Sequence, residues 1–284
     1  MQAGEWTPLV TALVPTYNGA EFITRTLDSL AAQTWPELEI LIGDDRSTDD
    51  TLGVVRRFAA DHANTRIVER DTNLGWLRNS NDLMARAAGE LMFFAFHDDV
   101  VAPTYVEELV DALRTNDRAV LAFSDMRVHE VDGRSELQVF DELEGLRTSL
   151  ERGRVMVRRP GNWWVPNRGL FRASAFTKVG GIHPNELGEY SADWTWLLGL
   201  SLVGEFVRVP RVLCTKYYTA GSLSKRWPHD ATQVLALQRS GIAEIDRSRL
   251  SPGRKVMLKG HLWRRVHGRR LPGGVKRVFR RLGL

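Results

Sequence analysis

The chain has 284 residues, of which 43% are hydrophobic and 26% charged, and it has a single cysteine, Cys214. This composition is ordinary for a globular protein, and it excludes wholesale disorder, a collagen-like repeat and a multispan membrane protein. One cysteine also excludes an intrachain disulfide and a Cys-rich zinc site, and it fits a reducing compartment.

Positive charge is concentrated at the end of the chain. Thirteen of the 39 Lys and Arg residues lie within 247–284, which has no Asp or Glu and therefore a net charge of +13. The first 246 residues hold the other 26 basic residues and all 35 acidic ones, a net charge of −9. The body and the tail therefore need separate explanations.

The first half of the sequence alternates between two kinds of apolar pattern. In chain order we predict a strand at 10–14, a helix at 22–32, a strand at 38–42, a helix at 51–60, a strand at 66–69, a helix at 75–88, a strand at 91–96, a helix at 103–114 and a strand at 119–124. Strands separated by helices of about ten to fifteen residues predict βαβ units and a mostly parallel sheet.

The second half is less regular. We predict a hairpin at 128–139 that turns at Asp132-Gly133, a charged helix at 142–157, a Pro/Gly/Trp loop at 158–168, a short helix at 173–179, an amphipathic helix at 192–202, strands at 206–209 and 212–218, and a helix at 230–246. No signal peptide is expected, and no apolar run approaches the ~20 residues that span a bilayer.

Polar and acidic residues follow the predicted strands of the first half. They are Thr16, Tyr17 and Asn18 after the first strand, Asp44 and Asp45 after the second, and Asp98 and Asp99 after the fourth. Ligands of open α/β sheets bind beyond the carboxyl ends of the strands. Clustered carboxylates are best tolerated around a cation or a donor-rich ligand, so a binding site is predicted at this edge. Helix capping is the alternative for Asp44 or Asp45 alone.

Motifs in a fixed order resemble the family 2 glycosyltransferases over roughly residues 8–125. They are Val14-Pro15-Thr16-Tyr17-Asn18, then Asp44-Asp45-Arg46-Ser47-Thr48-Asp49-Asp50-Thr51, Asn73-Leu74-Gly75 with Arg78-Asn79, Ala88-Gly89-Glu90 and Asp98-Asp99. Gly169-Leu170-Phe171-Arg172, Val179-Gly180-Gly181 and the acidic stretch 189–193 agree with it. The resemblance implies the glycosyltransferase A fold, a mostly parallel nucleotide-binding α/β sheet flanked by helices.

The resemblance also implies a division of the chain and an activity. Residues 1–125 would form the nucleotide-sugar-binding half, 126–229 the half with the acceptor site and catalytic base, and 230–284 a set of C-terminal helices with a basic tail. The implied activity is inverting transfer of a sugar from a nucleotide-diphosphate sugar, with UDP as the favoured nucleotide. The acceptor would be a hydroxyl of a saccharide or lipid-linked molecule in cell-surface glycan synthesis.

Donor-binding roles follow from the resemblance for residues at the strand ends. The residues that would surround the donor nucleotide are Thr16, Tyr17, Asn18, Asp44, Asp45 and Asp98. A carboxylate beyond a strand end suits ribose hydroxyls, because it accepts hydrogen bonds from both. Arg78 would lie near the base or the phosphates, and its alternative is a solvated helix face.

Asp98 and Asp99 resemble the metal motif of the family, with Asp99 the favoured direct ligand. Carboxylate oxygens suit Mn²⁺ or Mg²⁺, which would neutralise charge on the departing diphosphate. Departures from the pattern put the metal geometry in doubt: Phe96, Ala192 and Arg46 replace frequent family residues, and 216–225 has no His near the expected diphosphate. The candidates to replace that His are Lys216, Lys225 and Arg226.

Asp193 is the candidate general base implied by the resemblance, and Glu189 competes with it. Partial burial beside tryptophans would raise the pKa of Asp193 toward a useful value. A carboxylate that only faces the helix dipole is the alternative. Trp163, Trp164 and Trp194 are candidate acceptor-binding residues together with Glu189, and core packing is the alternative for the tryptophans.

Other functions are weighed against glycosyl transfer. A sugar-phosphate nucleotidyltransferase would need a Gly-rich loop after the first strand, and 15–20 contains one Gly. A protein that binds nucleic acid through the basic tail conflicts with the acidic body and the lack of a nucleic-acid motif.

The basic tail contains an apolar stripe formed by Val275, Val278, Phe279 and Leu282. This pattern predicts peripheral binding to an anionic membrane, on its cytoplasmic face. Packing of this stripe on the acidic body is the alternative.

Overall fold

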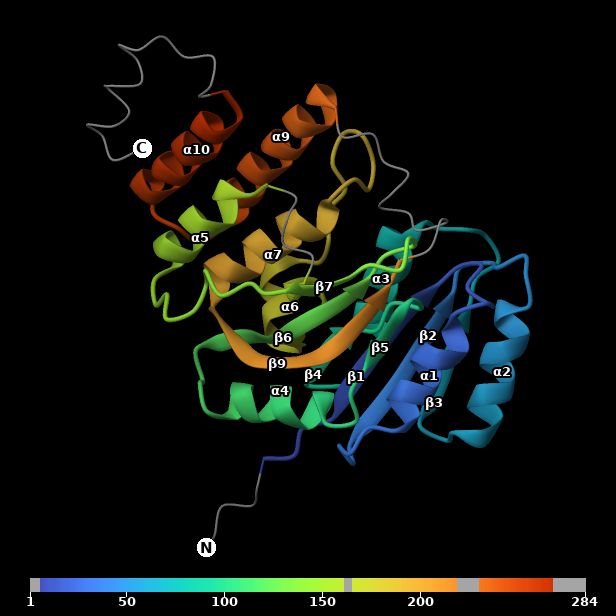
Figure 1. Cartoon of the computed structure of the whole chain (residues 1–284). Coiled ribbons are helices and arrows are strands. Elements are labelled where there is room, and N and C mark those ends of the chain that lie inside the picture. The colour runs from blue at the N-terminus through green and yellow to red at the C-terminus, as the bar shows by residue number, and fades with distance from the viewer. Residues whose placement is uncertain (1–5, 161–164, 219–229, 268–284) are drawn as a thin grey trace, which may run out of the picture.

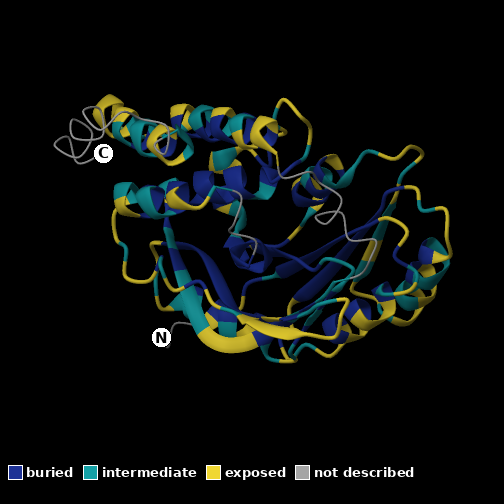
Figure 2. Ribbon diagram, turned by 45° about the horizontal axis from the view of Figure 1, so that its top comes forward, coloured by how far each residue is buried: buried dark blue, intermediate teal, exposed yellow. Residues whose placement is uncertain are grey.

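The centre of the protein is a mixed sheet. The computed structural model describes residues 6–160, 165–218 and 230–267. Within these residues the sheet has nine strands in the order β3-β2-β1-β4-β8-β6-β9-β5, and β7 pairs with β6 (Figure 1). Helices cover much of the sheet and its central strands are buried, whereas β7 and part of β9 are exposed at the surface (Figure 2).

The first half of the chain forms the parallel part of the sheet. Its strands are β1 (Val10–Thr16), β2 (Leu38–Asp44), β3 (Thr65–Glu69) and β4 (Leu91–Phe94). The helices between them are α1 (Ile23–Ala31), α2 (Thr51–Asp61) and α3 (Trp76–Arg86). Every residue of β1, β2 and β4 is buried, as expected for strands covered on both faces. The predicted βαβ units are confirmed.

The second half adds mainly antiparallel strands. They are β5 (Asp99–Val101), β6 (Ala119–His129), β7 (Ser135–Gln138), β8 (Leu170–Arg172) and β9 (Glu205–Tyr217), with α4 (Tyr105–Arg114) before β6. Only β6 and β9 pair in parallel among these. The sequence missed β5 and β8 because three residues are too few to show a period. The predicted hairpin between β6 and β7 is confirmed.

A single strand, β9, replaces the two late strands that the sequence predicted. Its register against β6 shifts between Ser124 and Asp125, where the partner changes from Val209 to Val212. Pro210 and the exposed Arg211 form the inserted segment, since proline cannot donate to the ladder. The bulge lets one strand serve both halves of β6 and continue to β5.

Helices of the C-terminal half pack on one another beside the sheet (Figure 1). They are α5 (Ser149–Arg158), α7 (Ala192–Val203), α9 (Ala231–Arg247) and α10 (Pro252–His267), with the 3-10 turn η1 (Pro166–Arg168) and α6 (Ala173–Val179) nearby. α5 begins later than predicted, because a capping box between Thr148 and Glu151 fixes the start of the helix at Ser149. α7 is buried nearly all round rather than amphipathic, since α5, α6 and α9 all contact it.

Part of the basic C-terminal region belongs to the packed body. α10 contacts α5 and α9, and its Leu258 and Leu262 are fully buried. A Cβ on Gly153 of α5 would lie 2.8 Å from Leu258, so these helices approach closely. The predicted stripe from Val275 onward lies outside the described residues. No helix among those described combines the length and apolar character needed to cross a membrane.

Candidate active site

The carboxyl ends of three neighbouring parallel strands meet at one edge of the sheet. Thr16 ends β1 and lies opposite Asp44, the last residue of β2. β4 pairs with the other side of β1, and Asp98 follows β4 after a short turn. The fold therefore gathers at one edge the strand-end residues that the sequence singled out.

Several polar atoms at this edge are buried without a partner. Thr16 Oγ1, Asp44 Oδ1 and His97 Nδ1 have no hydrogen-bond partner among the described residues. Such groups are nearly always paired in folded proteins. Gly19 leaves room beside Thr16 and His97, because a Cβ there would lie 3.0 Å from Thr16 Oγ1 and 3.1 Å from the His97 ring. Hydroxyl and amide groups of a ligand are suitable partners for these atoms.

Two other predicted residues hold the loops around the edge. Asp45 is 2% exposed, and its carboxylate accepts hydrogen bonds from the backbone N–H of Leu74 at 2.7 Å and of Gly75 at 2.9 Å. Asn18 accepts through Oδ1 from the backbone N–H of Thr48 at 2.7 Å. Asp45 and Asn18 therefore shape the site, and their direct contact with a donor stays a prediction.

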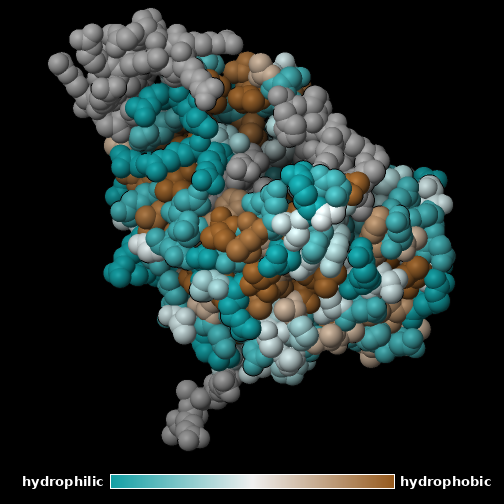
Figure 3. Space-filling model, viewed as in Figure 1, coloured by the Kyte–Doolittle hydropathy of each residue, from teal (hydrophilic) through white to brown (hydrophobic). Residues whose placement is uncertain are grey.

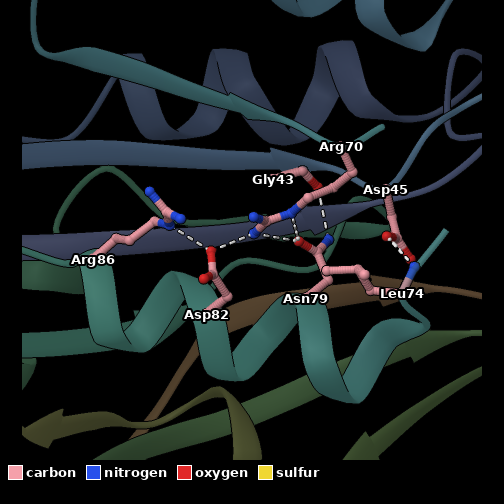
Figure 4. A network of polar contacts seen from close by, with 7 residues as sticks. All are labelled: Gly43, Asp45, Arg70, Leu74, Asn79, Asp82 and Arg86. Carbon is pink, nitrogen blue, oxygen red and sulfur yellow. Dashed lines mark hydrogen bonds and ion pairs between the residues drawn. The ribbon is translucent and has the colours of Figure 1, made fainter. Parts of the chain in front are cut away.

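A polar network attaches α3 to β2 next to this loop (Figure 4). Asn79 of α3 donates to the Gly43 carbonyl at 2.8 Å and accepts from Arg70 at 3.1 Å. Arg70 continues to Asp82 at 2.6 Å, and Asp82 also accepts from Arg86 at 2.6 Å. The network ties the start of α3 to the end of β2, so the loop that Asp45 binds has a rigid base.

Asp98 and Asp99 belong to an ion-pair cluster. Lys216 Nζ lies 2.7 Å from Asp98 Oδ2 and 3.6 Å from Asp99 Oδ1, and Arg168 Nε lies 2.8 Å from Asp99 Oδ2. Burial acts to raise the pKa of Asp98. The charge and hydrogen bond of Lys216 oppose burial, His97 and Arg168 act in the same direction as Lys216, and the pKa of Asp98 is therefore below its usual value. Two carboxylates and two cations leave the cluster with no net charge.

Arg168 is a site residue that the sequence reasoning missed. It ends η1, its guanidinium carbon lies 4.6 Å from the centre of the Phe96 ring, and the Tyr105 hydroxyl donates to its carbonyl. Phe96 therefore provides an aromatic face for this cation. No local pattern marks Arg168, because only the pairing of β8 with β4 and β6 brings it to Asp99.

The residues of this cluster do not fit a resident divalent cation. Each carboxylate already pairs with a cationic side chain, although Asp99 Oδ1 is buried without a hydrogen bond and lies 3.6 Å from Lys216 Nζ. No group of three or more His, Cys, Asp or Glu side chains suited to a metal occurs in the described parts of the chain. The sequence favoured Asp99 as the direct ligand, but the Asp99 side chain is 2% exposed and held by Arg168. Asp98, at 15%, is the more accessible of the two carboxylates.

Asp193 lies in the first turn of α7 and remains partly exposed. Its Oδ1 accepts a hydrogen bond from the backbone N–H of Trp194 at 2.9 Å. Burial raises the pKa of Asp193 above its usual value, although the nearby charge of Arg168 opposes the shift. A partly accessible carboxylate with a raised pKa is suited to accept a proton near neutral pH. Arg168 thus lies close to both Asp193 and Asp99.

Glu189, the competing base, lies in the loop before α7 and contacts the start of α3. Its Oε1 accepts a hydrogen bond from the backbone N–H of Leu77 at the start of α3, and burial raises its pKa. Arg78 is exposed in the same turn, and its charge acts on Glu189 in the opposite direction. Tyr17 is 45% exposed beside β1, which leaves its ring available to a ligand.

The tryptophans predicted to bind the acceptor divide into two groups. Trp194 is 1% exposed, and its indole N–H donates to the Met156 carbonyl at 3.2 Å. The prediction of an acceptor-binding role for Trp194 is therefore wrong, since a ring packed in the core offers no surface to a sugar. Trp163 and Trp164 lie outside the described residues, as do Lys225 and Arg226.

Comparisons with known proteins agree with this fold and site. Residues 11–173 match the sequence profile of the family described as Glycosyl transferase family 2. The chain is 28% identical over 253 residues to Uncharacterized protein MT1568 of Mycobacterium tuberculosis, covering 86% of this chain and 74% of that protein. It is 37% identical over 92 residues to poly(ribitol-phosphate) beta-N-acetylglucosaminyltransferase TarS of Staphylococcus aureus, covering 31% and 16%.

Solved structures show the same fold at low sequence identity. Residues 1–349 of S. aureus TarS, in complex with UDP-GlcNAc, match with a TM-score of 0.72 at 19% identity, covering 91% of this chain and 72% of that one. The mannosyltransferase PcManGT from Pyrobaculum calidifontis, in complex with GDP-Man and Mn²⁺, matches with a TM-score of 0.60 at 20% identity, covering 92% and 70%. Apart from the M. tuberculosis protein, the chain spans between 15% and 34% of the length of the curated relatives compared.

Proposed function

Because this chain belongs to glycosyl transferase family 2, with its glycosyltransferase A fold, we propose that it transfers a sugar from a nucleotide-diphosphate sugar to a hydroxyl of a saccharide or lipid-linked acceptor, with inversion at the anomeric carbon. Relatives of the chain are named as glycosyltransferases that act in polymer synthesis, among them TarS and chondroitin synthase. Their names support a role in glycan synthesis and leave the acceptor of this chain open.

The observation that carries the proposal is the row of buried, unpartnered polar atoms at the edge of the sheet. Thr16 Oγ1 and Asp44 Oδ1 lie at the ends of adjacent parallel strands, the usual ligand-binding edge of an open α/β sheet. Ribose and base groups of a nucleotide can donate hydrogen bonds to both atoms. TarS has been solved with UDP-GlcNAc and UDP, which supports UDP as the nucleotide to test first.

The chemistry assigned to this chain is a proton transfer coupled to displacement. Asp193, with its raised pKa, accepts the proton of the acceptor hydroxyl while that oxygen bonds to the anomeric carbon. The bond from the anomeric carbon to the diphosphate breaks, and its electron pair leaves with the diphosphate. Attack from the face opposite the leaving group inverts the configuration. The nucleotidyltransferase and nucleic-acid-binding alternatives have no comparable observation in their favour.

Donor use is tested by incubating the protein with UDP-, dTDP- and GDP-sugars and measuring the nucleoside diphosphate released, in Mn²⁺ and in EDTA. Thr16→Val should weaken UDP binding several-fold to about ten-fold, because one hydrogen bond is worth ~1 kcal/mol. Thr65→Val is the matched control, since Thr65 Oγ1 is also buried without a described partner but begins β3 at the opposite edge. Absence of release from every donor, or equal effects of the two variants, would contradict the proposal.

We also propose that α10 contributes to binding an anionic membrane surface. Val256 is 65% exposed and Trp263, seven positions later on the same face, is 37% exposed, while Arg254, Arg264 and Arg265 are exposed elsewhere on the same helix. The visible face of α10 is mainly hydrophilic (Figure 3). Each basic side chain near an anionic surface contributes ~1 kcal/mol, so a few of them hold a protein there reversibly.

Sedimentation with vesicles of anionic phospholipid tests this second proposal. Removing the chain after Ser251 would expose the faces of α5 and α9 that pack on α10, because Leu258 and Leu262 of α10 are buried. Surface substitutions are therefore the better probe. Arg254→Glu with Arg265→Glu should lower the bound fraction, whereas Arg57→Glu with Arg134→Glu, on distant elements, should not. Equal sedimentation of the two double variants would count against α10.

A further inference from the structure

Lys216 is held beside Asp98 and Asp99 by the backbone. It lies opposite Asp99 in the antiparallel pairing of β5 and β9, and the next residue, Tyr217, donates its N–H to the Asp98 carbonyl at 3.0 Å. The Lys216 side chain is 8% exposed, and its ammonium group lies 4.9 Å from the centre of the Tyr218 ring. Its position is therefore set by strand register rather than by a flexible surface rotamer.

The ammonium group retains capacity for a further ligand. It has three N–H donors, and the described contacts are one hydrogen bond to Asp98 and a longer ion pair to Asp99. Arg168 differs, because its guanidinium is stacked on Phe96 and bonded to Asp99 in the interior. Lys216 pairs with Asp98, which is the more accessible carboxylate of the cluster.

A divalent cation bound by Asp98 would meet this ammonium at short range. The two positive charges repel each other, and a metal would have to displace Lys216 from the position 2.7 Å from Asp98 Oδ2. Displacement is costly, since the strand pairing keeps the Lys216 backbone where it is and the charge would lose its carboxylate in a buried setting. The chain thus already has a fixed cation beside the two strand-end carboxylates of the proposed donor site.

We infer that Lys216 takes the place of a metal ion and stabilises the departing diphosphate, so that turnover does not require a divalent cation. The inference rests on the proposed function and assigns one of its catalytic groups. When the bond to the anomeric carbon breaks, its electron pair goes to the diphosphate oxygen, and the proton of the acceptor goes to Asp193. Lys216 keeps its own protons and donates a hydrogen bond to the diphosphate, so it ends the cycle unchanged.

The test compares wild type, Lys216→Ala and Lys178→Ala, each in EDTA and in Mn²⁺. Binding of UDP, dTDP and GDP is measured by calorimetry, and diphosphate release is measured with the best donor of the panel. Lys178 is an exposed lysine on α6 and serves as the matched control. Wild type and the control should bind nucleotide in EDTA within about three-fold of their affinity in Mn²⁺.

Loss of Lys216 should lower turnover in EDTA by ~10²–10³-fold, the range for removing one preorganised charge-stabilising donor. Mn²⁺ should restore part of this loss in Lys216→Ala, because the vacated carboxylate is then free to bind it. A wild type that needs Mn²⁺ both for nucleotide binding and for turnover would overturn the inference and leave the proposed function intact. Failure of UDP, dTDP and GDP all to bind in either condition would instead overturn the proposed function.

Discussion

The carboxylate of Glu189 accepts a hydrogen bond at 3.2 Å from the backbone N–H of Leu77, although 112 positions separate the two residues. The bond joins the loop before α7 to the first turn of α3. Gly75 makes the approach possible, since a Cβ there would lie 2.6 Å from Glu189 Oε1. An acidic loop of the second half is thereby fastened to the nucleotide-binding edge of the first half.

Separate substitutions should distinguish the two candidate bases. Asp193→Asn should lower kcat by ~10²–10⁴-fold, the usual contribution of a general base, and leave UDP binding nearly unchanged. Glu189→Gln keeps an oxygen that accepts from Leu77, so its kcat should stay within a few-fold of wild type. Steady-state kinetics and UDP calorimetry measure both effects. Collapse of kcat in Glu189→Gln with a mild effect of Asp193→Asn would reverse the assignment.

The pH dependence of stability should reveal the buried charge of Asp193. Its folded-state pKa is raised above 3.8, so the folded protein loses stability as the pH rises from 3.8 to that raised value, and the full penalty remains at higher pH. Asp193→Asn should therefore be more stable than wild type at neutral pH, and the gain should disappear as the pH falls toward 3.8. Urea unfolding between pH 4 and 8 measures the difference.

Asp132 serves as a comparison, because its pKa is shifted in the direction opposite to that of Asp193. A hydrogen bond from Arg134 holds the pKa of this exposed carboxyl below its usual value, so ionised Asp132 slightly favours the folded state above its unfolded pKa. Asp132→Asn should be slightly less stable than wild type at neutral pH. An identical response of the Asp193 and Asp132 variants would rule out burial as the origin of the Asp193 shift.

Gly75 should be more sensitive to substitution than another glycine with a similar φ angle. Gly75 has φ +83°, donates its N–H to Asp45 and faces Glu189, whereas Gly133 has φ +84° and nothing within 4 Å of its Cβ position. Gly75→Ala should destabilise by ~1–3 kcal/mol and weaken UDP binding, because backbone strain and a clash act together. Gly133→Ala should cost ~1–2 kcal/mol, with UDP binding unchanged. Thermal unfolding and calorimetry test the pair.

The ion pair of Arg168 with Asp99 should dominate the stability of the cluster. Arg168→Met leaves the buried Asp99 carboxylate with only its longer ion pair to Lys216 and should destabilise the fold by ~3–5 kcal/mol. Arg56→Met removes an exposed pair with Glu69 and should cost ~1 kcal/mol or less. Adding Asp99→Asn to Arg168→Met should recover part of the loss. Equal costs of the two single variants in urea unfolding would show that the cluster is solvated.

Local pattern was sufficient for the parallel half of the protein. β1, β2 and β4 are mainly apolar and have polar residues at or shortly after their ends, and parallel strands with short connections place their carboxyl ends at one edge. The sequence therefore determined that the ends carrying Thr16, Asp44 and Asp98 would meet. It also indicated Asp193 as a partly buried carboxylate, through its position at the start of a helix rich in tryptophan.

Tertiary structure decided the partners of those residues. Lys216 and Arg168 reach Asp98 and Asp99 through antiparallel pairing of β5 with β9 and of β8 with β4, and strands of three residues have no period that a sequence can display. Burial of Trp194 likewise depends on helices that surround α7 from distant parts of the chain. Local sequence determines which residues end a strand. Long-range strand pairing determines which charged side chains face each other, because the residues that neutralise a buried charge can lie far from it in the chain.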